Sequence, residues 1–336
     1  MTTQSIDWKN EWFPIEDATY LNFAAHAAIP RVALNAVQAS VAAKRRPHIV
    51  DDRSFFFVAA NLRQTLATLI GASQDDIALT TGAGAGLAII AYALKWSAGD
   101  EVIIAGGEFP THYATWKPME AREGIKVQIT HPQDQFIQSG DLIAAMTPRT
   151  RVISVSHVRF DDGSILDASS LAAACKRNGT LFVLDVSQSC GAIPMDVSSL
   201  GADFIVSAGY KYLLSPWGTG FLWAKSENAD LLRPGPYNWL SQDVETFARL
   251  NFVDPRPVRT LSRWDAAQGP DRFGAHVKRI PAPVAHDPPA RLVTNYRAAG
   301  RTVSPPNTFS GPAPLCAKVS RQTPPGGPTS REDEGS

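Results

Sequence analysis

The chain has 336 residues, an apolar fraction of 44% and equal numbers of basic and acidic residues, 32 of each. Its formal net charge of zero excludes no fold, but it gives no sign of a nucleic-acid partner. The longest apolar run, Leu87–Leu94, is too short to span a bilayer, and the polar N-terminus lacks the apolar core of a signal peptide. We therefore expect a soluble cytoplasmic protein.

Residues 1–30 are interpreted as an N-terminal arm, and helical and strand patterns alternate from about Leu34 to Ser226. Apolar residues at helical spacing predict helices over 34–41 and 62–70, with Gly71 placed to end the second. Two further amphipathic segments are His112–Glu123 and Ser169–Arg177, the latter closed by Gly179. Runs rich in β-formers predict strands at Ile77–Thr80, Glu101–Ala105, Lys126–Thr130, Arg151–Val158, Leu181–Val186 and Asp203–Ser207.

Strands separated by helix-length connections imply crossovers, and therefore a mainly parallel sheet covered by helices on both faces, an α/β fold. One connection is different, because only a short segment rich in Gly, Pro and Ser joins Asp203–Ser207 to Gly220–Ala224. A segment this short predicts an antiparallel neighbour joined by a loop. Lys211 lies at the start of that loop.

The last fifth of the chain, residues 268–336, has a different composition. It lacks helical periodicity and holds about half of the 25 prolines. Such sequence cannot bury enough apolar surface to offset the entropy of ordering, so a largely disordered tail is predicted. The three cysteines, Cys175, Cys190 and Cys316, show no CxxC spacing, and we interpret them as small buried apolar residues rather than metal ligands.

A glycine-rich turn, TTGAGAG (Thr80–Gly86), lies between a predicted strand and the apolar helix Leu87–Leu94. Glycines at such a turn let backbone N–H groups face an anion, and the helix dipole favours a phosphate there. A tight turn without any ligand explains the pattern as well. A dinucleotide site would need an acidic residue at the end of the next strand, where Asp100 and Glu101 instead begin it.

Asp185, in LFVLDVSQSCG, ends an apolar strand at the edge where open parallel sheets bind ligands. A carboxylate in that position is costly unless it is paired, and a protonated pyridine nitrogen is one suitable partner. An ordinary helix N-cap is the competing interpretation.

Lys211, in SAGYKYLLSPWGTGFLW, follows an apolar strand, so its amine can point into the same crevice. A partly desolvated lysine has a lowered pKa and reacts with aldehydes, although a lone loop lysine is usually a solvated charge. Phe109, in GGEFPTHYATW, follows another strand at the same edge. Taken alone, Phe109 is better explained as ordinary core.

Together these residues resemble the class V aminotransferase family of enzymes, which use pyridoxal 5′-phosphate (PLP) on a fold type I scaffold. The family includes cysteine desulfurases, selenocysteine lyases, kynureninases and isopenicillin epimerase-like enzymes. The resemblance covers roughly Tyr20 to Ala267 and is best over Asp203–Phe221, where a lysine is followed by a loop and GTGF. The segments YLNFAAHAAIP, GDEVII and SRWDAA match further landmarks of the family.

The resemblance implies a role for each matching residue. Lys211 would form the Schiff base with PLP and later move the proton at the substrate Cα. Asp185 would pair with the pyridine nitrogen, and Gln188 would bond the phenolic oxygen of the ring. The implied substrate is an amino acid, and the implied assembly is a homodimer.

The remaining carried-over positions surround the same cofactor. Phe109 falls where the family has its ring-stacking residue, which is often His. Ala83 and Gly84 would offer backbone N–H groups to the phosphate, and Tyr210 would bond it as well. No metal site is implied.

Three departures distinguish this chain from the family pattern. Gly84 stands where many members carry a Thr hydroxyl, and Ala208 stands where a Ser is common, with Ser207 one place away. The third departure follows Ala267, where the family continues into a small domain that supplies an arginine for the substrate carboxylate. Neither that arginine nor a desulfurase cysteine motif is recognisable here, so we expect little or no turnover.

The sequence thus predicts an N-terminal arm at 1–30, a PLP-binding large domain at 31–267 and a Pro-rich tail at 268–336, with the small C-terminal domain incomplete. The predicted function is that of a PLP-dependent enzyme acting on an amino acid, of the aminotransferase, lyase or epimerase type. Two alternatives remain, namely a catalytically impaired remnant that acts as a binding or non-functional protein, and a nucleotide-binding α/β protein that uses TTGAGAG.

Overall fold

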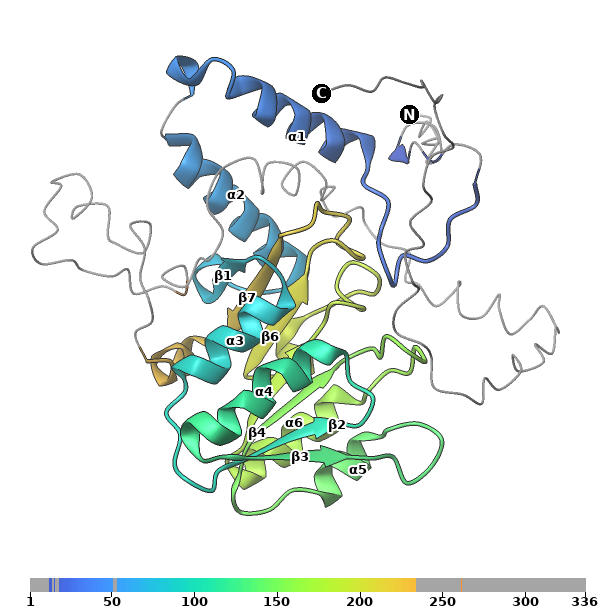
Figure 1. Ribbon diagram of the computed structural model, residues 1–336, viewed down its shortest axis with the longest axis vertical. Coiled ribbons are helices and arrows are strands. Elements are labelled where there is room, and N and C mark those ends of the chain that lie inside the picture. Colours follow the sequence, from blue (N-terminus) through green and yellow to red (C-terminus); the bar gives the residue numbers. More distant parts are fainter. Residues whose placement is uncertain (1–11, 14, 16–17, 51–52, 234–260, 262–336) are drawn as a thin grey trace, which may run out of the picture. The chain divides into compact units, whose positions relative to one another are not determined.

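The computed structural model describes residues 12–13, 15, 18–50, 53–233 and 261. Within them, seven strands form one sheet in the order β1-β7-β6-β5-β4-β2-β3 (Figure 1). The strands are β1 (Ile77–Thr80), β2 (Glu101–Ala105), β3 (Lys126–Thr130), β4 (Thr150–Ser156), β5 (Leu181–Asp185), β6 (Phe204–Ala208) and β7 (Gly220–Ala224). The predicted tail at 268–336 lies outside the described residues.

The strand directions confirm both sequence predictions about the sheet. Strands β2 to β6 pair in parallel with their neighbours, and β7 runs antiparallel to β6 and to β1. Since β1 is antiparallel to β7, it has the same direction as the parallel strands. The turn after β1 therefore lies at the carboxyl edge of the sheet, together with the ends of β2, β4, β5 and β6.

The helices follow the predicted spacing, with boundaries set by caps. Asp167 accepts a hydrogen bond from the Ser170 backbone at the start of α6, and Gly179 ends that helix in the left-handed conformation, with φ of 73°. The α-helices are α1 (Arg31–Ala43), α2 (Arg53–Ile70), α3 (Ala83–Ala93), α4 (Pro110–Glu123), α5 (Ser139–Ala144), α6 (Ala168–Asn178) and α7 (Val197–Leu200). Short 3-10 helices occupy Pro47–Ile49, Gln74–Asp76 and Ser226–Leu231.

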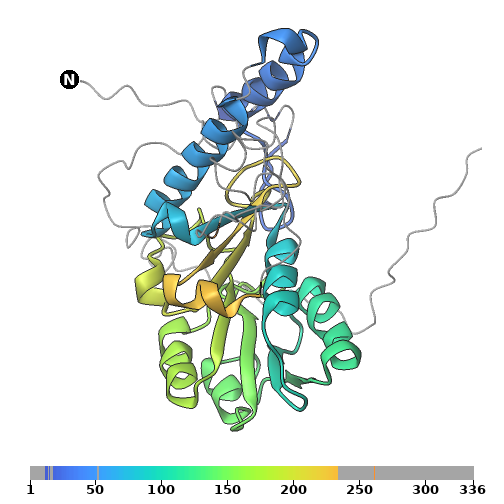
Figure 2. The same cartoon turned by 90° about the vertical axis from the view of Figure 1, so that its left-hand side faces the viewer.

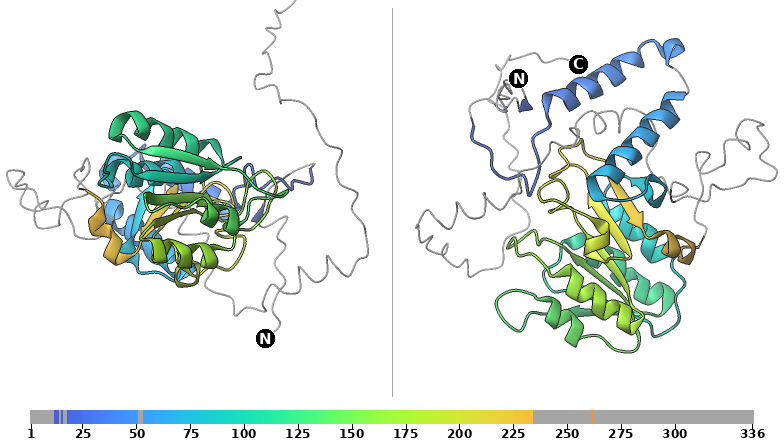
Figure 3. Two further views of the ribbon diagram at one scale, coloured as in Figure 1. Left: turned by 90° about the horizontal axis from the view of Figure 1, so that it is seen from below. Right: turned by 180° about the vertical axis from the view of Figure 1, so that it is seen from behind.

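The sheet is buried on both faces because alternate side chains of its strands enter two separate apolar clusters. Phe182 and Leu184 of β5 pack with residues of α2, α5 and α6, whereas Leu181 and Val183 pack with residues of α3 and α4. The two helical layers lie on either side of the sheet in Figures 2 and 3. This arrangement leaves the carboxyl edge as the place where polar side chains gather.

Candidate functional site

A cavity of about 120 Å³ opens at the carboxyl edge of the sheet. All the site residues predicted from sequence line this cavity, namely Ala83, Gly84, Phe109, Asp185, Gln188, Tyr210 and Lys211. They come from the turn after β1, the turn after β2, the end of β5 and the loop after β6. The parallel strands bring these distant segments together because their carboxyl ends meet at one edge.

The glycine turn begins helix α3 at this edge. Gly82 has φ of 154° and ψ of 176°, a conformation that is essentially restricted to glycine. The Thr80 hydroxyl fixes the turn by donating to the Gly82 carbonyl oxygen at 2.9 Å. The N–H groups of Ala83 and Gly84 lie in the first turn of the helix, where backbone donors have no intrahelical acceptor. The turn therefore offers donors and the positive end of a helix dipole to an anion.

Asp185 is a buried carboxylate that lines the cavity. Its Oδ1 accepts a hydrogen bond from the Ser187 backbone N–H at 2.8 Å, and its Oδ2 lies 3.8 Å from the Nε2 of His112. Burial by itself raises the pKa of Asp185, but the His112 and Ser187 contacts outweigh burial and lower that pKa. Asp185 is therefore ionised and directs negative charge into the cavity.

Lys211 is only 6% exposed and lines the cavity with Asp185. Burial lowers the pKa of Lys211, and the nearby charge of Asp185 partly offsets this effect. Its Nζ lies 5.0 Å from the centroid of the Phe109 ring. The alternative that Lys211 is a solvated surface charge is wrong, because its side chain is buried.

Phe109 is the N-cap of α4 and is 36% exposed, so it is not an ordinary core residue. The Phe160 ring meets it edge-on, with centroids 5.2 Å apart and planes at 87°. Phe109 lines the cavity, and the Lys211 amine lies over its ring.

The N-terminal arm contributes contacts that the sequence did not predict. The Gln188 Nε2 donates to the Ala24 carbonyl oxygen at 3.1 Å, and the Ala27 N–H donates to the Tyr210 carbonyl oxygen at 3.0 Å. The Gln188 Oε1 is buried without a hydrogen-bond partner among the described residues. Burial and the charge of Asp185 raise the pKa of Tyr210, so its phenol stays protonated and can donate.

The cavity is also lined by residues that sequence reasoning missed, namely Thr111, Ser156, Val158, Phe160 and Ser187. Thr111 bears on the first departure, because a Cβ added at Gly84 would lie 2.9 Å from the Thr111 methyl carbon. Thr111 thus occupies the space beside Gly84 where a larger residue at 84 would extend. The sequence feature that could have identified Thr111 is a hydroxyl residue near the start of the helix that follows Phe109.

The second departure has a structural explanation in the alternation of strand β6. Ala208 lines the cavity, whereas Ser207 is fully buried and its hydroxyl donates to the Ala208 carbonyl oxygen at 3.2 Å. Successive residues of a strand point to opposite faces, so Ser207 does not take the place of the missing serine. The hydroxyl of Ser187, which accepts from the Ala208 N–H at 2.9 Å, lies at the cavity instead.

Other sequence expectations concern metals, cysteines and membranes. Over residues 18–50 and 53–233, no group of three or more His, Cys, Asp or Glu side chains is arranged so that it could hold a metal ion. Cys175 and Cys190 are buried as predicted, and Cys316 lies outside the described residues. In that same part of the chain, none of the helices combines the length and the apolar character needed to cross a membrane.

Comparison with known proteins identifies a family that this chain matches. Residues 19–239 match the family model of the class V aminotransferases. The chain is 30% identical over 187 residues to isopenicillin N epimerase of Streptomyces clavuligerus, covering 54% of this chain and 47% of that protein. It is 29% identical over 173 residues to a probable cysteine desulfurase of Methanothermobacter thermautotrophicus, covering 51% and 43%. The chain spans about half the length of these curated relatives.

Solved structures agree on the fold. The complex of the cystine C-S lyase C-DES with its reaction product, cysteine persulfide, superposes with a TM-score of 0.73 at 24% identity, covering 79% of this chain and 72% of that one. The apo cysteine desulfurase from Thermococcus onnurineus superposes with a TM-score of 0.69 at 20% identity, covering 81% and 69%.

Proposed function

Because this chain belongs to the class V aminotransferase family, whose enzymes use PLP, we propose that it binds PLP covalently through Lys211 and acts on an amino acid. The observation that carries the proposal is the convergence of Lys211, Asp185 and Phe109 in one cavity beside the N-terminus of α3. The alternative of a nucleotide-binding protein requires only the glycine turn. That alternative leaves the burial of Lys211 and Asp185 in the same cavity unexplained.

The lining residues fit the separate chemical parts of PLP. The N–H groups of Ala83 and Gly84 suit the phosphate, because a helix N-terminus favours a dianion. The ionised Asp185 suits the protonated ring nitrogen, and the Lys211 amine suits the aldehyde. The buried Gln188 Oε1, which has no partner among the described residues, is a polar atom that a bound ligand would satisfy.

When bound, PLP supplies an electron sink for charge that develops at the substrate Cα. Asp185 would keep the ring nitrogen protonated, and Phe109 would pack beside the ring. Burial of Lys211 increases its neutral, nucleophilic fraction, so its amine would be suited to hold the aldehyde and to move the proton at the substrate Cα. Tyr210 and Gln188 would orient the cofactor by hydrogen bonds.

Borohydride trapping tests this proposal directly. The purified full chain is titrated with PLP, reduced with borohydride and digested, and the peptides are analysed by mass spectrometry. We expect a new visible absorbance and one modified peptide that contains Lys211. Modification of a different lysine, or no stable modification, would overturn the assignment.

We expect Thr111 to replace the hydroxyl that is missing at position 84. Thr111→Val keeps the shape of the side chain but removes one hydrogen bond to the charged phosphate, so PLP affinity should fall about 10-fold, the lower end for a hydrogen bond to a charged group. Thr115→Val is the matched control, since Thr115 is a buried threonine of the same helix that does not line the cavity. Fluorescence titration with PLP measures both variants, and equal affinities would remove Thr111 from the phosphate site.

The assembly and the reaction outcome belong to the same proposal. A homodimer located in the cytoplasm is the arrangement that we propose from the family resemblance. A cofactor-binding protein with impaired turnover is the second candidate, because the match to the family model covers residues 19–239 only. An assay against a panel of amino acids separates the two, because saturable turnover at ordinary enzyme rates excludes impairment.

A further inference from the structure

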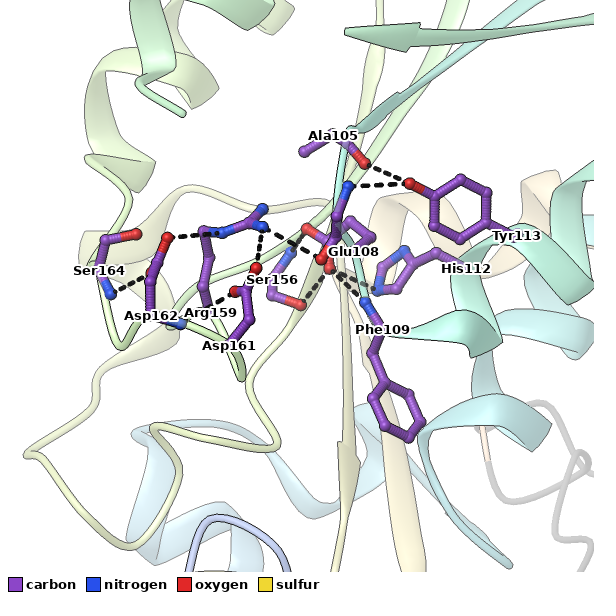
Figure 4. A network of polar contacts seen from close by, with 11 residues as sticks. Ala105, Glu108, Phe109, His112, Tyr113, Ser156, Arg159, Asp161, Asp162 and Ser164 are labelled. Carbon is purple, nitrogen blue, oxygen red and sulfur yellow. Dashed lines mark hydrogen bonds and ion pairs between the residues drawn. The ribbon is translucent and has the colours of Figure 1, made fainter. Parts of the chain in front are cut away.

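His112 is fully buried and lies beside Glu108, whose contacts with Ser156 and Phe109 are drawn in Figure 4. It belongs to α4, and its Nε2 lies 3.8 Å from the Oε2 of Glu108 and 3.8 Å from the Oδ2 of Asp185. Its Nδ1 lies 3.1 Å from the hydroxyl oxygen of Ser154. His112 thus faces one carboxylate that lines the cavity and a second one that does not.

Glu108 has the contacts of an ionised carboxylate. Its two oxygens accept hydrogen bonds from the Ser156 N–H at 2.8 Å, the Ser156 hydroxyl at 2.6 Å and the Phe109 N–H at 3.3 Å. Donors on both oxygens favour the ionised form of a carboxylate, which can accept at each of them. Two buried negative charges would then face one histidine, and such an arrangement is costly unless a cation lies between them.

We propose that His112 is a positioning residue, an imidazolium whose Nε2 side faces both Glu108 and Asp185 at ion-pair distance and whose charge thereby keeps Asp185 ionised and oriented toward the cavity. The effect on the cofactor rests on the proposed function, whereas the charge state of His112 does not. Glu108, Asp185 and His112 then carry two negative charges and one positive charge. The net charge of these three side chains is therefore negative, which favours a protonated ring nitrogen beside Asp185.

The directions of the pKa shifts agree with this geometry. Burial lowers the pKa of His112, but Glu108 and Asp185 outweigh burial and raise it. The other charged groups that act on the pair are Arg159, which interacts with Glu108, and Lys211, which interacts with Asp185. A hydrogen bond to the backbone of Ser154 on β4 raises the pKa of His112 further.

His157 provides a natural contrast within the same chain. It is also buried, and its Nδ1 lies 3.0 Å from the Ser189 hydroxyl oxygen, a contact like that of His112 with Ser154. Burial lowers the pKa of His157. The two histidines therefore share burial and a serine contact at Nδ1, whereas of the two only His112 forms ion-pair contacts with carboxylates.

Nitrogen NMR of the cofactor-free full chain, labelled with ¹⁵N-histidine, tests the charge state. An ordinary histidine is about 90% neutral near pH 7.5, because its pKa is about 6.5. We expect both ring nitrogens of His112 to be protonated there and His157 to be neutral. Glu108→Gln should lower the His112 midpoint by about one pH unit or more. A neutral His112 at this pH would overturn the proposal without any variant being made.

The consequence for the cofactor is tested with His112→Gln, and His157→Gln is the control. We expect PLP affinity to fall about 10-fold or more in His112→Gln, because Asp185 loses a charged partner. The pH below which binding is lost should also move upward, as Asp185 becomes easier to protonate. Equal affinity and an unmoved acid limb would show that His112 is only structural. If the unmodified chain itself binds no PLP, the proposed function fails, and the NMR result still decides the state of His112.

Discussion

Lys211→Ala is expected to abolish borohydride-stable attachment of PLP to the chain. The buried Lys211 amine is the proposed nucleophile, and no other lysine of the described residues lines the cavity. Any amino-acid-dependent change in the cofactor spectrum should slow by about 100- to 10,000-fold, the usual contribution of a general acid or base. Absorbance and peptide mass analysis after reduction measure both effects.

The matched control for Lys211 is Lys225→Ala. Lys225 follows β7 and pairs with Asp203 at 3.3 Å, and it does not line the cavity. Attachment in this variant should equal that of the unmodified chain. Because burial lowers the pKa of Lys211, the rate of attachment should rise with pH and level off below the ordinary lysine range. Full attachment in Lys211→Ala would contradict the proposed function.

Asp185→Asn should give the second largest effect. The variant keeps an oxygen that accepts from the Ser187 N–H, so the fold should be retained. It loses the charge that holds the protonated ring nitrogen, and PLP affinity should fall about 10- to 100-fold. Asp203→Asn is the control, since Asp203 accepts from the Phe182 N–H at 2.8 Å but does not line the cavity.

The pH dependence of the Asp185 effect has a definite sign. The pKa of Asp185 is lower in the folded chain than in the unfolded chain, so ionisation of Asp185 stabilises the fold above its unfolded pKa. This contribution is lost as pH falls through the folded pKa. PLP binding should weaken over the same acidic range, and Asp185→Asn should remove this part of the pH dependence. An unchanged acid limb in Asp185→Asn would assign the limb to another group.

The sequence alone determined the scaffold and the edge of the sheet at which the candidate cofactor-binding groups lie. Apolar runs and glycine stops predicted the strands and helices, because these signals act over a few neighbouring residues. Each predicted site residue ended or followed a strand. Because the carboxyl ends of parallel strands meet at one edge of a sheet, the sequence placed all of these residues at that edge. The prediction that Arg151–Val158 is one strand was too long, since β4 ends at Ser156 and Val158 pairs in a separate bridge with Ile165.

Only the tertiary structure decided which side chains meet across different elements. Glu108 follows β2, Ser154 lies on β4 and Asp185 ends β5, and His112 contacts all three because β4 lies between β2 and β5 in the sheet. Strand order and register are global properties that no local pattern encodes. For the same reason, the sequence showed that Gly84 lacks the hydroxyl that many family members carry there. Only the packing of α4 against the glycine turn placed Thr111 beside Gly84.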